Sequence, residues 1–155
     1  MTLGSPPKRD ADFALEVEVE RAPAEVFAAI HDVSAWWITA VGGANAEVGD
    51  EFWVEKSGVH TCRLRVAQLV ADRRIVWRVV RSTRPSLADS EEWVGTDLTF
   101  ELFPAADGTR LRFTHVGLSP LDEGYDVSAR EWERHLGGRL ADLLALRAGT
   151  SEGER

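Results

Sequence analysis

The stretch from Asp122 to Arg147 limits the possible folds more than any other part of the chain, because it predicts one long amphipathic helix. Gly137 and Gly138 interrupt its interior, each at a cost of roughly 1 kcal/mol relative to alanine. They also leave a gap beside the apolar stripe, which predicts either close contact with a sheet or a hollow that admits a ligand. At about 100° per residue the stripe consists of Tyr125, Trp132, Leu136, Leu140, Leu143 and Leu146.

Length and composition predict a single soluble domain. The 155 residues, 44% of them hydrophobic and 28% charged, are enough to bury a core without disulfides or a structural metal. The net charge of −8 argues against nucleic acid or an anionic membrane as the main partner. No apolar run approaches the roughly 18 residues of a membrane span, so we expect no membrane insertion. With one cysteine and no signal-like N-terminus, a cytoplasmic protein is expected, with a domain over 12–149 between tails at 1–11 and 150–155.

The order of the elements predicts an α+β fold. Strict alternation from Phe13 to Glu20 is typical of a half-buried strand with an acidic outer face. Pro23 suits the first position of a helix over 24–30, and a second short helix is expected over 33–37. The glycine-rich segment 41–50 is expected to be a loop. Antiparallel strands are then predicted at 51–56, 60–70, 74–81, 93–103 and 109–116, before the long helix with Asp122 as its N-cap.

Strand parity predicts an aromatic inner face of this sheet of about six strands. If the alternation of the strand at 74–81 continues to its end, Arg81 also lies on the inner face. A bulge at Gly95 would change the alternation before it, so Trp93 can lie on either face. Aromatic walls with a few polar groups suit a largely apolar pocket, although six tryptophans can equally fill a core. The candidate ligand-binding residues are Trp77, Arg81, Trp93, Phe100, Phe113, His115, Tyr125, Trp132 and Leu136.

Signatures of metal, cofactor and nucleophile chemistry are missing from the sequence. The histidines at 31, 60, 115 and 135 have no metal-ligand spacing, and there is no phosphate-binding loop or nucleophile elbow. We therefore predict no cofactor, no metal and no assigned catalytic residue. Cys62, on an apolar strand face, is read as a core residue. His115 is the best candidate for a polar group in an apolar site, and the alternative is a structural histidine bonded to a backbone carbonyl.

Several segments carry a resemblance to a known family. They are Ala22–Phe27, Trp36-Trp37, Val48–Phe52, Arg74–Trp77, Glu92–Leu102, Gly108–Leu118 and Tyr125–Trp132. In order and spacing they resemble the activator-of-heat-shock-protein-90-ATPase-homologue-like family of the START and birch-pollen-allergen-like superfamily, known as SRPBCC. This resemblance implies a helix-grip fold, in which a curved antiparallel sheet wraps round a long C-terminal helix with a cavity between them. Superfamily members include lipid and hormone carriers, polyketide cyclases, hydroxylase ligand-binding domains and co-chaperones.

Three functions follow as expectations. The first is non-enzymatic binding of a small hydrophobic or aromatic ligand between the sheet and the C-terminal helix. The second is a cyclase or hydrolase that uses His115 or Tyr125 as general acid or base on a bound carbonyl compound. The third is a protein-interaction module, with a chaperone as a possible partner, although the eukaryotic co-chaperones carry an additional N-terminal domain. A homodimer is compatible with all three.

Overall fold

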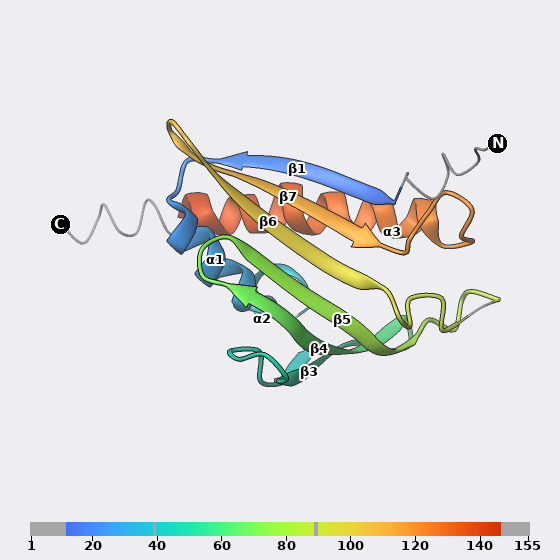
Figure 1. Cartoon of the computed structure of the whole chain (residues 1–155). Coiled ribbons are helices and arrows are strands. Elements are labelled where there is room, and N and C mark those ends of the chain that lie inside the picture. Colours follow the sequence, from blue (N-terminus) through green and yellow to red (C-terminus); the bar gives the residue numbers. More distant parts are fainter. Residues whose placement is uncertain (1–11, 39, 89, 147–155) are drawn as a thin grey trace, which may run out of the picture.

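An antiparallel sheet of seven strands forms the framework in the computed structural model, which describes residues 12–38, 40–88 and 90–146. The tails expected at 1–11 and 150–155 lie outside the described residues. The strand order is β1-β7-β6-β5-β4-β3-β2, and the sheet curves around the C-terminal helix (Figure 1). The strands are β1 (Phe13–Val19), β2 (Ala40–Gly43), β3 (Glu51–Lys56), β4 (His60–Val70), β5 (Arg74–Thr83), β6 (Asp97–Ala105) and β7 (Gly108–Val116). The predicted α+β class is confirmed.

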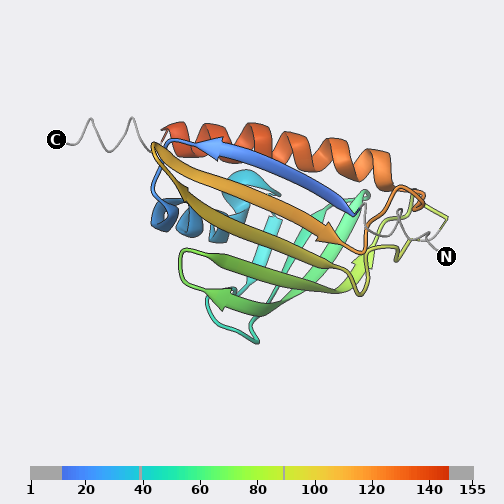
Figure 2. The same ribbon diagram turned by 45° about the horizontal axis from the view of Figure 1, so that its top comes forward.

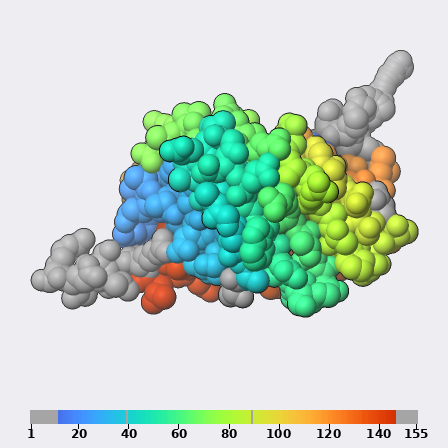
Figure 3. Space-filling model, turned by 90° about the horizontal axis from the view of Figure 1, so that it is seen from below, coloured from blue at the N-terminus to red at the C-terminus, as the bar shows by residue number. Residues whose placement is uncertain are grey.

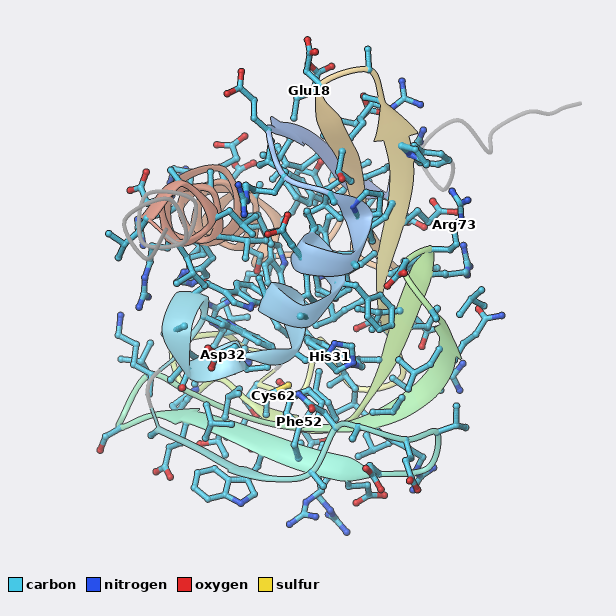
Figure 4. The ribbon with its side chains drawn as sticks, turned by 90° about the vertical axis from the view of Figure 1, so that its left-hand side faces the viewer. Glu18, His31, Asp32, Phe52, Cys62 and Arg73 are labelled. Carbon is cyan, nitrogen blue, oxygen red and sulfur yellow. The ribbon has the colours of Figure 1, made fainter. Side chains whose placement is uncertain are left out.

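Alternation of apolar and charged residues explains how the sheet divides inside from outside. Figure 4 shows Phe52 and Cys62 pointing into the interior beneath the short helices, whereas Glu18 and Arg73 project outward. Charged side chains pair across neighbouring strands on the outer face, as in the ion pairs Arg74–Glu101 (2.6 Å) and Arg78–Asp97 (2.5 Å). Burial of the apolar face therefore sets the register of the strands.

The edge strand β2 corrects one prediction, since its residues were expected to belong to a loop. Gly42 pairs with Trp53 of β3, and a Cβ atom at Gly42 would lie 2.4 Å from the Trp53 ring. The glycine that suggested a loop instead leaves room for an indole to lie across the edge of the sheet. This strand accounts for the count of seven rather than about six.

Two short helices follow β1, as predicted: α1 (Pro23–His31) and α2 (Val33–Trp36). Figure 2 shows them beneath the C-terminal helix on the side of the sheet where the core lies. Pro23 begins α1, where its missing N–H is not needed. Val26, Ala29 and Ile30 form the buried side of α1. These helices close the end of the fold where β1 leads toward β2.

The C-terminal helix, defined here as residues 125–146, begins later than expected and is not uniform. It comprises α3 (Tyr125–Trp132), a π-helical segment over Glu133–Leu140 and α-helical turns over 141–146. Asp122 is not its N-cap. The Asp122 carboxylate instead accepts a hydrogen bond of 2.8 Å from the Ser119 backbone N–H in the preceding turn.

The π-helical segment changes which leucines face the core. Trp132, Leu136, Leu140 and Leu144 are buried, Leu143 is half-buried and Leu146 is exposed. The predicted stripe assumed about 100° per residue throughout, whereas i→i+5 hydrogen bonds widen the turn and rotate later residues by a smaller angle. Leu144 therefore occupies the position predicted for Leu143. Among the described residues, no helix is long and apolar enough to cross a membrane.

Replacing Gly137 by alanine is expected to raise the free energy of unfolding by about 0.5–1 kcal/mol, because alanine restricts the unfolded chain and favours a helix. A Cβ at Gly137 would meet no atom within 4 Å. Gly108→Ala is the contrasting control, because its Cβ would lie 2.0 Å from the Val19 carbonyl oxygen. Urea unfolding of the two variants measures the effect. A destabilised Gly137→Ala would show that the π-helical segment requires glycine there.

Candidate functional site

A cavity of about 490 Å³ lies between the C-terminal helix and the end of the sheet formed by the β3–β4 hairpin and the β5–β6 connection. Figure 3 views the molecule from below, where residues 40–70 cover much of the face and the C-terminal helix shows along its border. The volume falls within the range of about 300–1,000 Å³ typical of small-molecule sites. The lining residues are Trp37, Ile38, Ala40, Glu55, Lys56, Ser57, Val59, His60, Arg84, Trp93, Glu131, Trp132, Arg134, His135 and Arg139.

Three tryptophans from separate segments form the apolar floor of this cavity. Trp93 stacks on Trp132 with ring centroids 5.6 Å apart and an interplanar angle of 15°. Trp37 meets the Trp132 ring at 5.1 Å and 47°. All three are at most 3% exposed. They line the cavity with little of their own area exposed, so they form a rigid apolar wall packed on the core.

A directed hydrogen-bond chain fixes the floor to the sheet. The Trp132 indole N–H can only donate, so His115 Nδ1, 3.1 Å away, must accept. His115 Nε2 therefore carries the proton and donates to Thr96 Oγ1 at 2.8 Å. The Thr96 hydroxyl in turn donates to the Trp93 carbonyl oxygen at 2.6 Å. We call this chain, Trp132–His115–Thr96–Trp93, the histidine clamp.

Burial keeps the clamp histidine neutral. It lowers the pKa of His115 to about 3, with smaller contributions from His60 and Arg84. A second proton would place a donor at Nδ1 against the Trp132 N–H. Both ring nitrogens are already engaged, which weighs against His115 as a general acid or base.

Arg84 enters the cavity wall because β5 contains a bulge. Arg63 pairs with Arg81 but Leu64 pairs with Val79, so Val80 has no partner across the strand pair. Side chains after Val80 change faces, which turns Arg81 outward and Arg84 inward. The predicted inward orientation of Arg81 is therefore wrong.

Buried contacts surround the Arg84 guanidinium. It donates to Ser128 Oγ at 2.9 Å and forms an ion pair with Glu131, both on the C-terminal helix. Its Cζ atom lies 5.6 Å from the centroid of the Trp93 ring. Arg84 thus holds the segment between β5 and β6 against the C-terminal helix at the edge of the cavity.

His60 and His135 also face the cavity as neutral rings. His60 Nε2 lies 3.0 Å from Ser82 Oγ, and burial, followed by the field of Arg84, lowers its pKa to about 3. Burial also lowers the pKa of His135 to about 4. Cys62 pairs with Ser82 across β4 and β5 and does not line this cavity, and burial raises the pKa of its thiol. No group of three His, Cys, Asp or Glu side chains in the described part of the chain is placed to hold a metal ion.

The candidate residues from the sequence occupy different places in the structure. Trp93 and Trp132 line the cavity, and the His115 ring lies behind them. Tyr125 meets Phe13 at 6.2 Å, at the first residue of α3 and away from the cavity. Arg81 lines a separate hollow of about 370 Å³ beside Trp53 on the outer face. Buried in the core and not in the cavity wall are Trp77, Phe100, Phe113 and Leu136.

Several cavity residues were missed from the sequence. Arg84 lies in a polar segment read as a break between strands, and the Val80 bulge leaves no recognisable sequence signal. Trp93 was a predicted candidate, but it belongs to a turn, because β6 begins at Asp97 rather than at residue 93 as predicted. The helix residues Glu131, Arg134, His135 and Arg139 lie beside the apolar stripe, where solvent exposure was the default expectation. Their position opposite the β3–β4 hairpin is a long-range feature.

The family profile described as "Activator of Hsp90 ATPase homolog 1-like protein" matches residues 21–145. The chain belongs to this family. No curated protein sequence matches it. The resemblance seen in the sequence is thereby confirmed, together with the helix-grip fold.

Solved structures share this fold. The Aha1 dimer from Colwellia psychrerythraea has a TM-score of 0.71 and 20% identity, covering 86% of this chain and 96% of that one. A protein from Mesorhizobium loti has a TM-score of 0.69 and 19% identity, with the same two coverages of 86% and 96%. A protein from the dynemicin biosynthetic locus has a TM-score of 0.65 and 18% identity, covering 85% of this chain and 46% of that one. These likenesses show the fold alone.

Replacing Arg84 by methionine is expected to lower the free energy of unfolding by about 2–4 kcal/mol, because it leaves Glu131 and Ser128 without their buried partner. Adding Glu131→Gln should recover at least about 1 kcal/mol by removing the unpaired charge. Arg78→Met is the matched control on the outer face and should cost about 0–1 kcal/mol. Denaturant unfolding of wild type, Arg84→Met, the double variant Arg84→Met/Glu131→Gln and Arg78→Met measures these differences. Equal costs at Arg84 and Arg78 would contradict a structural role for the buried pair.

The histidine clamp predicts acid-sensitive stability. The unfolded state binds a proton as the pH falls below about 6.5, whereas folded His115 resists protonation down to about 3. The contribution of neutral His115 to the free energy of unfolding is therefore complete above about pH 6.5 and is lost as the pH falls toward 3. Between pH 7 and 5 wild type should lose about 1–2 kcal/mol more than His115→Gln, which can keep both hydrogen bonds without titrating.

Urea unfolding at pH 7 and pH 5 measures this difference. His31→Gln is the control, because His31 lies at the end of α1 outside the clamp. A pH dependence in His115→Gln equal to that of wild type would contradict the clamp.

Proposed function

We propose that this chain binds a small, flat, largely apolar molecule in the cavity between its sheet and its C-terminal helix. The observation that carries the proposal is the 490 Å³ cavity with a floor of three tryptophan rings. Aromatic walls with a limited set of polar groups are typical of sites that bind small molecules. The floor is rigid, because the clamp and the stacked rings hold it in place without a ligand. Preorganisation of this kind lowers the cost of binding.

The other two functions expected from the sequence have less support. An enzyme based on His115 would need a free ring nitrogen, whereas both nitrogens lie within the clamp. Tyr125 does not line the cavity. A protein-interaction or chaperone-binding role stays a prediction, as does a homodimer, although the solved relative from Colwellia psychrerythraea is a dimer.

Binding of two aromatic fluorophores tests the proposal. They are N-phenyl-1-naphthylamine and its sulfonated counterpart, 8-anilinonaphthalene-1-sulfonate. At least one should bind saturably with one molecule per chain and with an increase in its own emission. Val59→Trp is expected to weaken this binding at least about tenfold, because Val59 is an exposed residue of the cavity wall and a larger side chain there occupies the space.

Val48→Trp is the matched control. It adds the same bulk to an exposed valine in the 44–50 loop, which does not line the cavity. Native mass spectrometry of the protein purified without added ligand gives an independent readout of any molecule that co-purifies. The proposal fails if neither fluorophore shows a saturable signal that Val59→Trp removes and Val48→Trp retains.

A further inference from the structure

The wall of the cavity carries an excess of positive charge in an acidic protein. The net charge of the chain is −8. Among the lining residues, however, the four cations Lys56, Arg84, Arg134 and Arg139 face only two carboxylates, Glu55 and Glu131. The cavity therefore differs in sign from the average surface of the molecule. Local charge, rather than net charge, determines which ligand a concave site attracts.

The two carboxylates do not cancel this excess. Glu131 pairs with the buried Arg84. Glu55 belongs to the outward-facing positions of β3, because it alternates with the buried Val54 and also borders the hollow on the outer face. Neither carboxylate therefore compensates the charges of Lys56, Arg134 and Arg139 inside the cavity.

These three cations come from opposite sides of the cavity. Lys56 ends β3, and Arg134 and Arg139 lie on the C-terminal helix. Arg139 donates a hydrogen bond of 2.8 Å to the Trp37 carbonyl oxygen, which orients it without neutralising it. Within the ranges that the structure describes, no carboxylate lies within ion-pair distance of Lys56 or Arg134.

The same three cations affect the pKa of His135. Burial is the largest cause of its lowered pKa, and the charges of Arg139, Arg134 and Lys56 lower it further, against an opposing effect of Glu131. The ring is therefore neutral near pH 7. Its Nδ1 atom is buried without a hydrogen-bond partner among the described residues, as is the Trp93 indole nitrogen in the same wall.

We propose that the ligand of this cavity is an aromatic anion. Its flat apolar body lies against the rings of Trp93, Trp132 and Trp37. Its carboxylate or sulfonate group lies between Lys56 on the hairpin and Arg134 and Arg139 on the helix. This inference rests on the proposed function and narrows the ligand class from hydrophobic to amphipathic and negatively charged. The charged group selects the ligand, while the tryptophan floor forms one apolar side of the site.

The two fluorophores separate these contributions, because they share the phenyl-naphthylamine body and differ only in the sulfonate. Wild type should bind the sulfonate at least about tenfold more tightly than the neutral compound. Lys56→Glu and Arg134→Glu should each weaken sulfonate binding by about three- to tenfold and change neutral binding by less than about twofold. Raising the salt concentration from 50 to 500 mM should weaken only sulfonate binding.

Arg73→Glu is the charge-matched control. It makes the same change in net charge at an exposed position in the β4–β5 turn, outside the cavity, and should leave both affinities within about twofold. The salt series on wild type provides a second measurement that needs no variant. Circular dichroism melting establishes that each variant is folded before its affinity is compared.

The outcomes distinguish this inference from the proposed function. Equal affinities for the two fluorophores, both removed by Val59→Trp and insensitive to Lys56→Glu and Arg134→Glu, would overturn the anion preference and leave small-molecule binding in place. A loss of sulfonate binding in Arg73→Glu as large as in Arg134→Glu would also overturn it, because the effect would then be one of net charge. Binding of neither fluorophore to the cavity would overturn both proposals.

Discussion

The hydrogen bond from the Trp132 indole to His115 is the constraint on which the interior depends. It crosses from the C-terminal helix to β7, where tertiary contacts rather than local propensity hold the helix in place. The same indole touches Phe113 on β7 and also Trp37 and Trp93, which come from two further segments of the chain. One side chain thus sets the position of the helix, the tautomer of the histidine and the floor of the cavity.

The residues that stabilise the core would also bind the proposed ligand. The rings that a ligand would touch are also rings of the core, so the floor cannot change shape without disturbing the fold. The polar rim is freer, because Lys56 and Arg134 are exposed and have no ion-pair partner among the described residues. In the proposed binding mode, the apolar contacts would therefore lie in a rigid part of the molecule, and the charged contacts in a part that tolerates substitution.

Patterns of short range were sufficient to predict much of the fold. Alternation in β1, the proline at the start of α1 and the apolar stripe of the last helix each depend on neighbours within a few residues. The family resemblance added the curvature of the sheet and a cavity beneath the helix. Prediction failed at Gly42, which enters a strand because Trp53 from a neighbouring strand covers it. It also failed at Leu144, because the sequence pattern assumed a regular α-helix and the π-helical segment rotates this residue inward. The cavity combined both, since Trp93 and Trp132 were expected but the cations of its rim depend on distant segments that meet only in the folded chain.

The bulge at Val80 gives the chain a way to change its interior without changing its chemistry. Arg81 and Arg84 stand three residues apart, and strand parity allows only one of them to face inward. Deletion of Val80 would leave both arginines where they are, whereas a regular strand that kept Val80 without the bulge would exchange them between the outer surface and the cavity wall. Among descendants of a common ancestor, the presence or absence of this bulge would therefore decide which arginine reaches the cavity, while both side chains are retained. Such a difference would lie in the register of two strands, where an alignment of the sequences does not record it.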